Sequence, residues 1–151
     1  MSIWGIGPIL GMVGTVTFIG SMMIGWQSGF TQYGFLGRDT AVAAGIALLT
    51  IGLVFYGNSV YLIVTRFRAG KLIRAGVFRI VRNPMYCAFI LFFMPGVSLL
   101  VDNWLVLATS LTVFAAFKLC IHREERFLES VFGDEYIQYV KEVKQIIPFI
   151  V

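Results

Sequence analysis

Two short polar clusters in a largely apolar sequence hold the side chains that could do chemistry. The first reads Arg82-Asn83-Pro84-Met85-Tyr86, with Gly76 and Phe78 shortly before it, and the second is the adjacent pair Glu124-Glu125. A guanidinium, two carboxylates and aromatic rings suit a zwitterionic ligand that also carries a flat base. Its carboxylate would meet arginine, its ammonium would meet glutamate, and its base would lie on an aromatic face. The same residues also fit a plainer role, in which they anchor the chain at a membrane interface and form a surface ion network.

Two residues are suited to shape the backbone around such a ligand. Pro84 is placed to start a helix, because its fixed φ and missing N–H suit the first helical position. Gly76 would allow the backbone to approach a ligand closely, because it has no Cβ. The first cluster is therefore predicted to lie at the mouth of a helix.

Several other chemistries lack the residues that they need. His122 is the one histidine, which excludes a histidine metal cluster or a histidine pair. Cys87 and Cys120 alone would leave a zinc site incomplete, so we interpret both as small apolar residues and expect no metal. No phosphate loop or dinucleotide fingerprint is found. No carboxylate lies deep in an apolar stretch, which argues against a proton-coupled drug exporter.

The composition predicts a membrane protein. Of 151 residues, 58% are hydrophobic and 13% charged, against about 25% charged residues in a soluble domain. Four stretches are long and apolar enough to span a bilayer: Ile3–Trp26, Thr40–Val64, Met85–Val101 and Trp104–Ile121. We predict an all-α fold, a polytopic membrane helical bundle of about four transmembrane helices with amphipathic C-terminal helices. Residues 1–151 would form one membrane domain, with two N-terminal spans in 1–65 and the ligand-binding core in 66–151.

The connection between the last two spans predicts how the polar clusters meet. Only Asp102 and Asn103 separate these spans, so they must form an antiparallel hairpin that brings both clusters to the same side. Eleven of the twelve basic residues lie on that side, and Arg38 is the exception. The positive-inside rule then places this side and both termini in the cytoplasm. Because the topology explains the basic residues, we expect no nucleic-acid partner.

The segment after the fourth span is amphipathic. Apolar side chains at helical spacing from Phe127 to Phe132 predict that span four continues as one helix until Gly133 stops it. Asp134 is expected to cap a second short helix that ends before Pro148. Its apolar stripe would consist of Tyr136, Tyr139, Val140 and Val143. These helices would lie at the cytoplasmic surface of the membrane.

The first span is rich in glycine. It has neither the basic n-region nor the cleavage site of a signal peptide, so we expect it to remain in the protein. Gly7 and Gly11 are spaced so that another helix could approach closely. That helix would belong either to the same bundle or to a second copy, which makes a homodimer through this span possible.

Six motifs occur in order between Leu72 and Phe149. They are Arg-x-Gly-x-Phe, Val-Arg-Asn-Pro-Met-Tyr, an apolar hairpin, Glu-Glu-x-x-Leu, Phe-Gly-x-x-Tyr-x-x-Tyr and a final Ile-Pro. This order closely resembles the integral membrane methyltransferases related to isoprenylcysteine carboxyl methyltransferase and phospholipid N-methyltransferase. The resemblance implies S-adenosylmethionine as cofactor, with its methyl group facing a lipid-accessible tunnel. It implies these cofactor-binding residues: Gly76, Phe78, Arg82, Asn83, Pro84, Tyr86, Glu124 and Glu125.

One residue departs from the family pattern. Asn83 stands where the family usually has histidine, and asparagine forms hydrogen bonds but carries no proton at neutral pH. The change therefore affects acid–base catalysis more than cofactor binding. If the acceptor is an amine, Glu125 or His122 would act as the base. Arg123 or Arg126 would orient an anionic head group.

These features predict an S-adenosylmethionine-dependent membrane methyltransferase that acts on a lipid or a hydrophobic small molecule. The methylated group would be a carboxylate, an amine or a thiol. Two alternatives remain. One is an NADPH-dependent membrane reductase on the same scaffold, and the other is a non-enzymatic helical membrane protein.

Overall fold

A computed structural model describes residues 5–28, 32–34, 36–66 and 71–147. The predicted start of span one at Ile3, the basic residue Arg68 and the predicted terminator Pro148 lie outside these residues. The described residues are helical apart from turns and short connections, which confirms the all-α prediction. The elements, in chain order, are α1 Gly7–Ser28, α2 Arg38–Arg66, the 3-10 turn η2 Gly76–Arg79, α3 Pro84–Cys87, the π-helical η3 Ala88–Phe93, α4 Met94–Leu100, α5 Val106–Phe132 and α6 Asp134–Glu142.

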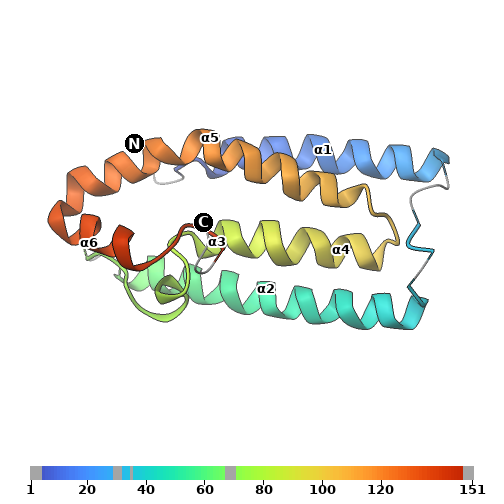
Figure 1. The fold of residues 1–151 in the computed structure, drawn as a ribbon, viewed down its shortest axis with the longest axis horizontal. Coiled ribbons are helices and arrows are strands. Elements are labelled where there is room, and N and C mark those ends of the chain that lie inside the picture. Colours follow the sequence, from blue (N-terminus) through green and yellow to red (C-terminus); the bar gives the residue numbers. More distant parts are fainter. Residues whose placement is uncertain (1–4, 29–31, 35, 67–70, 148–151) are drawn as a thin grey trace.

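The long helices form a bundle in which chain direction alternates. Helix α5 packs against α1 and α4, and α4 packs against α2, so α5 and α4 separate α1 from α2 (Figure 1). One end of the bundle holds the start of α1, the end of α2, α3 and α6, whereas the other holds the α4–α5 turn (Figure 1). We call the first of these the α6 end.

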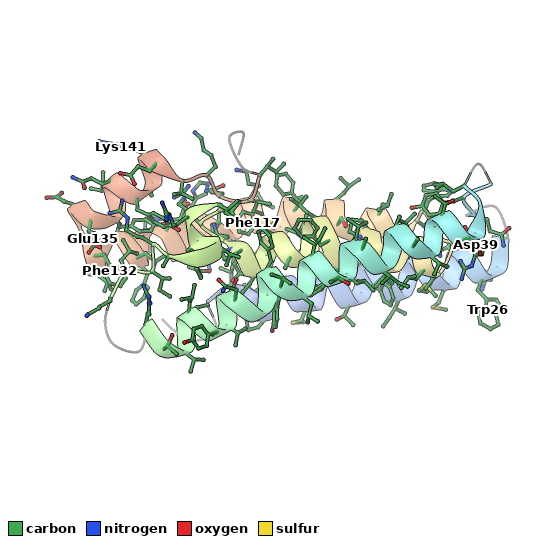
Figure 2. The ribbon with its side chains drawn as sticks, turned by 90° about the horizontal axis from the view of Figure 1, so that it is seen from below. Trp26, Asp39, Phe117, Phe132, Glu135 and Lys141 are labelled. Atoms are coloured by element: carbon green, nitrogen blue, oxygen red, sulfur yellow. The ribbon has the colours of Figure 1, made fainter. Side chains whose placement is uncertain are left out.

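Among the described residues, three helices are long and apolar enough to cross a membrane: Gly7–Gln27, Arg38–Arg66 and Val106–Phe132. The third predicted span is a shorter apolar helix, Pro84–Leu100, in which α3, η3 and α4 run on without a break. Side chains project outward along the whole bundle (Figure 2), and large apolar ones are exposed there, as on Met12, which is 72% exposed, and Leu119, which is 82% exposed. Such a surface is stable in contact with lipid, so the helical membrane bundle is confirmed.

The hairpin between α4 and α5 forms as predicted. Asp102 adopts a positive φ of 53°, and the side chain of Asn103 is buried in the turn. The Asn103 amide donates to the Ser21 carbonyl of α1 and accepts from the Leu105 N–H. Because these bonds occupy residues 103–105, α5 begins at Val106, slightly later than the predicted start of span four. The turn holds α4 and α5 antiparallel and ties α1 to them.

The C-terminal helices follow the prediction in part. Helix α5 runs unbroken to Phe132, and Gly133 ends it with φ 52°. Asp134 does not cap α6: it is the first residue of the helix, and Gly133 in the cap position makes no side-chain bond. Val143 is also not part of the helical stripe, because the chain is extended there. The next residues leave the helix to pair with the backbone before α3.

Gly7 and Gly11 do not pack against another helix of the bundle, whereas Gly14 of the same span lies against Val113 and Phe89. Apart from the neighbouring residues and the backbone of α1 itself, no atom of the described residues lies within 4 Å of a Cβ built on Gly7 or Gly11. A close approach of helix backbones occurs instead between α2 and α4, where a Cβ on Gly45 would lie 2.9 Å from the Gly96 carbonyl. Glycine is needed at that crossing because any side chain would separate the helices. A homodimer through the first span stays a prediction.

Candidate functional site

The α4–α5 hairpin brings the two polar clusters together at the α6 end. Arg82, two residues before α3, lies with its Nη1 3.0 Å from Oε1 of Glu125 on α5. The two side chains are 9% and 20% exposed, so the ion pair is largely shielded from water. The guanidinium Nε and Nη1 are both buried, and neither makes a hydrogen bond among the described residues, so Nη1 contacts Glu125 as an ion pair. Nε, which has no ion-pair partner among these residues either, is left as a donor for a ligand.

Helix α6 closes the site with two buried tyrosines. Tyr136 bonds to the Arg82 side chain, and burial together with the nearby Glu125 charge raises its pKa to about 12. The Tyr139 hydroxyl donates to the Phe78 carbonyl at 2.6 Å, and burial raises the pKa of this tyrosine as well. Both hydroxyls therefore stay protonated at neutral pH; the Tyr139 hydroxyl donates to Phe78, whereas the Tyr136 oxygen accepts from Arg82.

Two residues at the site were not predicted from the sequence. The Gln145 side-chain Nε2 donates to Glu125 Oε1 at 2.8 Å, and the Lys118 ammonium donates to Gln145 Oε1 at 2.7 Å. The backbone around Gln145 also accepts the N–H groups of Arg82 and Asn83, at 2.7 Å and 3.0 Å. Neither residue belongs to a motif, and Lys118 was counted only as a topological charge. The one feature of the sequence that could have indicated Gln145 is that it is a polar residue directly before the apolar residues at the end of the chain.

The two adjacent glutamates contact different groups. Glu125 faces Arg82, whereas Glu124 accepts from the Tyr86 hydroxyl at 3.4 Å and from the Ile6 backbone N–H at the start of α1. Successive residues of an α-helix point about 100° apart, so one pair of neighbours cannot both face the same guanidinium closely. The structure thus places Glu124 beside Tyr86, and its action on the cofactor stays a prediction.

Gly76 makes room for α2. It has φ 57°, and a Cβ there would lie 2.4 Å from Oδ1 of Asn58 on α2. The same Oδ1 accepts the Val77 N–H at 3.2 Å. The Gly76 backbone therefore approaches α2 closely, and its approach to a ligand stays a prediction.

The mouth of α3 is built as predicted. Pro84 is the first residue of the helix and is buried. Asn83 lies in the cap position without a side-chain cap bond, and its Nδ2 is 3.5 Å from the Gln145 carbonyl. The ring of Tyr86 packs on that of the fully buried Phe117, with centroids 5.4 Å apart. These rings supply the apolar wall beside the ion pair.

The other predicted catalytic residues lie at the edge of the site. His122 Nδ1 is 3.9 Å from Oε2 of Glu125, and its side chain is 70% exposed. Arg126 donates to the His122 carbonyl at 3.3 Å and is exposed. The structure brings His122 within reach of Glu125, whereas Arg126 has no ion pair among the residues described.

One known protein family matches the part of the chain that contains the Arg82–Glu125 pair. The sequence model of the family described as "Phospholipid methyltransferase" matches residues 39–135, from the start of α2 into α6. The chain belongs to this family. The matched range contains both members of the Arg82–Glu125 pair and ends before Gln145.

Curated relatives of the chain are protein-S-isoprenylcysteine O-methyltransferases. Relative A from Arabidopsis thaliana is 32% identical over 79 residues, 52% of this chain and 40% of the relative. Relative B from the same plant is 28% identical over 113 residues, 74% of this chain and 57% of the relative. That of Schizosaccharomyces pombe is 38% identical over 80 residues, 52% of this chain and 34% of the relative. The chain thus spans about half the length of these relatives or less. No solved structure matches it significantly.

Proposed function

We propose that the protein is an S-adenosylmethionine-dependent membrane methyltransferase that acts on a lipid or hydrophobic small-molecule acceptor. The observation that carries the proposal is the shielded Arg82–Glu125 pair, which lies within the family match. The names of the relatives support a methyl transfer, and the apolar helices support its location in a membrane. The acceptor group would be a carboxylate, an amine or a thiol.

The residues at the site fit this cofactor in charge and shape. The buried, unpartnered Nε of Arg82 would donate to the cofactor carboxylate. Glu125 would hold its ammonium, with Glu124 beside it, and the Tyr86 ring would contact the adenine. Asn83, Pro84, Gly76 and Phe78 would support these contacts through the backbone at the mouth of α3. When bound, S-adenosylmethionine supplies a methyl group on a positively charged sulfur.

The protein's own residues would mainly exclude water and hold charge. If the acceptor is a carboxylate or a thiolate, opposite charges cancel during transfer, so the dry wall of Tyr86 and Phe117 favours the reaction without a base. If the acceptor is an amine, a base must remove its proton, and His122 or Glu125 would do so. Arg126 would then orient an anionic head group at the membrane surface.

The surroundings of the site favour an acceptor that enters laterally from the membrane. Two aromatic residues, Phe89 on η3 and Phe114 on α5, pack against the core cluster that contains the buried Phe117. A water-soluble molecule would lose hydration along such a surface with little polar compensation. An amphiphile would keep its tail in the bilayer while its head group reaches the site.

Calorimetric titration of the detergent-purified protein tests the cofactor. We expect S-adenosylhomocysteine to bind and NADPH not to bind, and Arg82→Ala and Glu125→Ala to weaken binding tenfold or more, since each removes a charge-assisted contact of roughly 1.5 to 3 kcal/mol. Binding of NADPH alone would support a reductase, and binding of neither would support a non-enzymatic role. Unchanged affinity in both variants would refute this assignment of the site.

Membranes supplied with radiolabelled methyl donor test the acceptor. We expect the labelled product to partition into the organic phase. Label found only in water-soluble molecules would contradict the lipid acceptor even if methyl transfer were observed.

A further inference from the structure

The two oxygens of the Glu125 carboxylate have different surroundings. Oε1 meets both Arg82 Nη1, at 3.0 Å, and Gln145 Nε2, at 2.8 Å. Oε2 makes no hydrogen bond within the described part of the chain, and His122 Nδ1 lies 3.9 Å from it. One oxygen is therefore held inside the protein while the other remains available.

Charge determines how the Gln145 amide must be oriented. A carboxylate accepts hydrogen bonds and an ammonium only donates them, so the amide must turn its NH₂ to Glu125 and its oxygen to Lys118. In the opposite orientation the amide oxygen of Gln145 would lie against the Glu125 carboxylate, and its NH₂ would lie against the Lys118 ammonium. Two acceptors and two donors would then face each other, and neither pair could form a hydrogen bond. Lys118 thus fixes the amide, and the amide fixes the carboxylate.

The position of Lys118 is unusual. It precedes Glu125 by seven residues, which is about 10 Å along α5 and toward the bilayer. Its neighbours are the buried Phe117 and the lipid-facing Leu119. A cation in such surroundings is costly, and no carboxylate of the described residues lies within ion-pair distance of it. Its described polar partner is the neutral oxygen of Gln145.

We propose that Lys118 and Gln145 are positioning residues that hold Oε1 of Glu125 against Arg82 and present Oε2 to the ammonium of the bound ligand. The proposal rests on the proposed function for the identity of that ligand. The relay itself rests on three contacts that join side chains of α5, the side chain of Arg82 and the segment after α6.

A double-mutant cycle tests the relay through ligand affinity. Lys118→Met and Gln145→Leu should each weaken S-adenosylhomocysteine binding about fivefold, the effect of one hydrogen bond. The double variant should bind as well as Gln145→Leu alone, because Lys118 acts through Gln145. Lys118→Arg retains a donor and should restore most of the affinity. Lys141→Met and Gln138→Leu, at exposed positions of α6, are the matched controls and should bind like the parent.

Nuclear magnetic resonance gives a readout that needs no ligand. The chain has four glutamines, and the side-chain NH₂ signals of Gln145 are identified by their loss in Gln145→Leu. Lys118→Met should shift or broaden these signals, and Lys141→Met should leave them unchanged. If Gln145→Leu does not fold, Gln145→Glu identifies the same signals.

The outcomes are distinct. Unchanged Gln145 signals in Lys118→Met, or additive losses of affinity in the cycle, would overturn the relay. A parent protein that fails to bind S-adenosylhomocysteine, while its Gln145 signals still respond to Lys118→Met, would overturn the proposed cofactor and leave the orientation of Glu125 supported.

Discussion

Replacing Glu125 with glutamine removes one charge and almost no volume, and so isolates the ion pair with Arg82. Glutamine still offers an oxygen to Gln145, but it leaves the guanidinium without its counter-ion. Removal of one partner from a fully buried pair costs about 3 to 5 kcal/mol. The Glu125 side chain is 20% exposed, so water partly screens the charge left on Arg82. We therefore expect a smaller loss, of about 2 to 4 kcal/mol, in the free energy of unfolding.

The measurement is the unfolding free energy in neutral detergent, compared with a variant on the same helix. Glu129→Gln changes the same groups at an exposed position of α5 without an ion pair among the described residues, and should cost less than about 0.5 kcal/mol. Arg82→Met combined with Glu125→Gln should cost less than the sum of the single changes, because no lone charge remains. Equal stability of Glu125→Gln and Glu129→Gln would show that the pair is not shielded, and the reasoning about the site would fail.

Three further predictions concern the scaffold. Gly76→Ala should destabilise the protein by about 2 to 4 kcal/mol, because the added Cβ would clash with Asn58 and the residue has a positive φ. Gly57→Ala is the control and should be neutral or stabilising, because a Cβ built there meets no atom of another element within 4 Å. Equal effects of the two changes in thermal denaturation would contradict this prediction. The raised pKa of Tyr136 predicts a contribution to stability that is fully present below about pH 10 and is lost as the pH rises to about 12, because the tyrosine of the unfolded chain ionises first. Tyr136→Phe should therefore make the fall of the melting temperature between these pH values shallower. An equally steep fall in Tyr136→Phe would contradict this prediction. Reporter fusions should place both termini in the cytoplasm, and a C-terminal reporter active only outside would refute the topology.

The amino-acid sequence by itself determined the class of fold and the side on which the chemistry gathers. Apolar stretches of this length have only a helical solution in lipid, because every backbone polar group must be bonded internally. A two-residue connection at Asp102 and Asn103 leaves an antiparallel hairpin as the one arrangement. That hairpin was sufficient to predict that the cluster around Arg82 and the Glu124–Glu125 pair would share one end of the bundle, whereas the structure decided that Glu125 is the glutamate that faces Arg82.

Only the tertiary structure decided which groups complete the site, because these contacts join residues that no local pattern links. Gln145 contacts Glu125 although the end of α5 and the whole of α6 lie between them in the sequence. Lys118 contacts Gln145 only because the chain leaves α6 at Val143 in an extended conformation. The requirement for Gly76 likewise comes from Asn58 on α2, far away in the chain. Local periodicity predicts helices and their faces, whereas the partner of each polar side chain depends on how those helices pack.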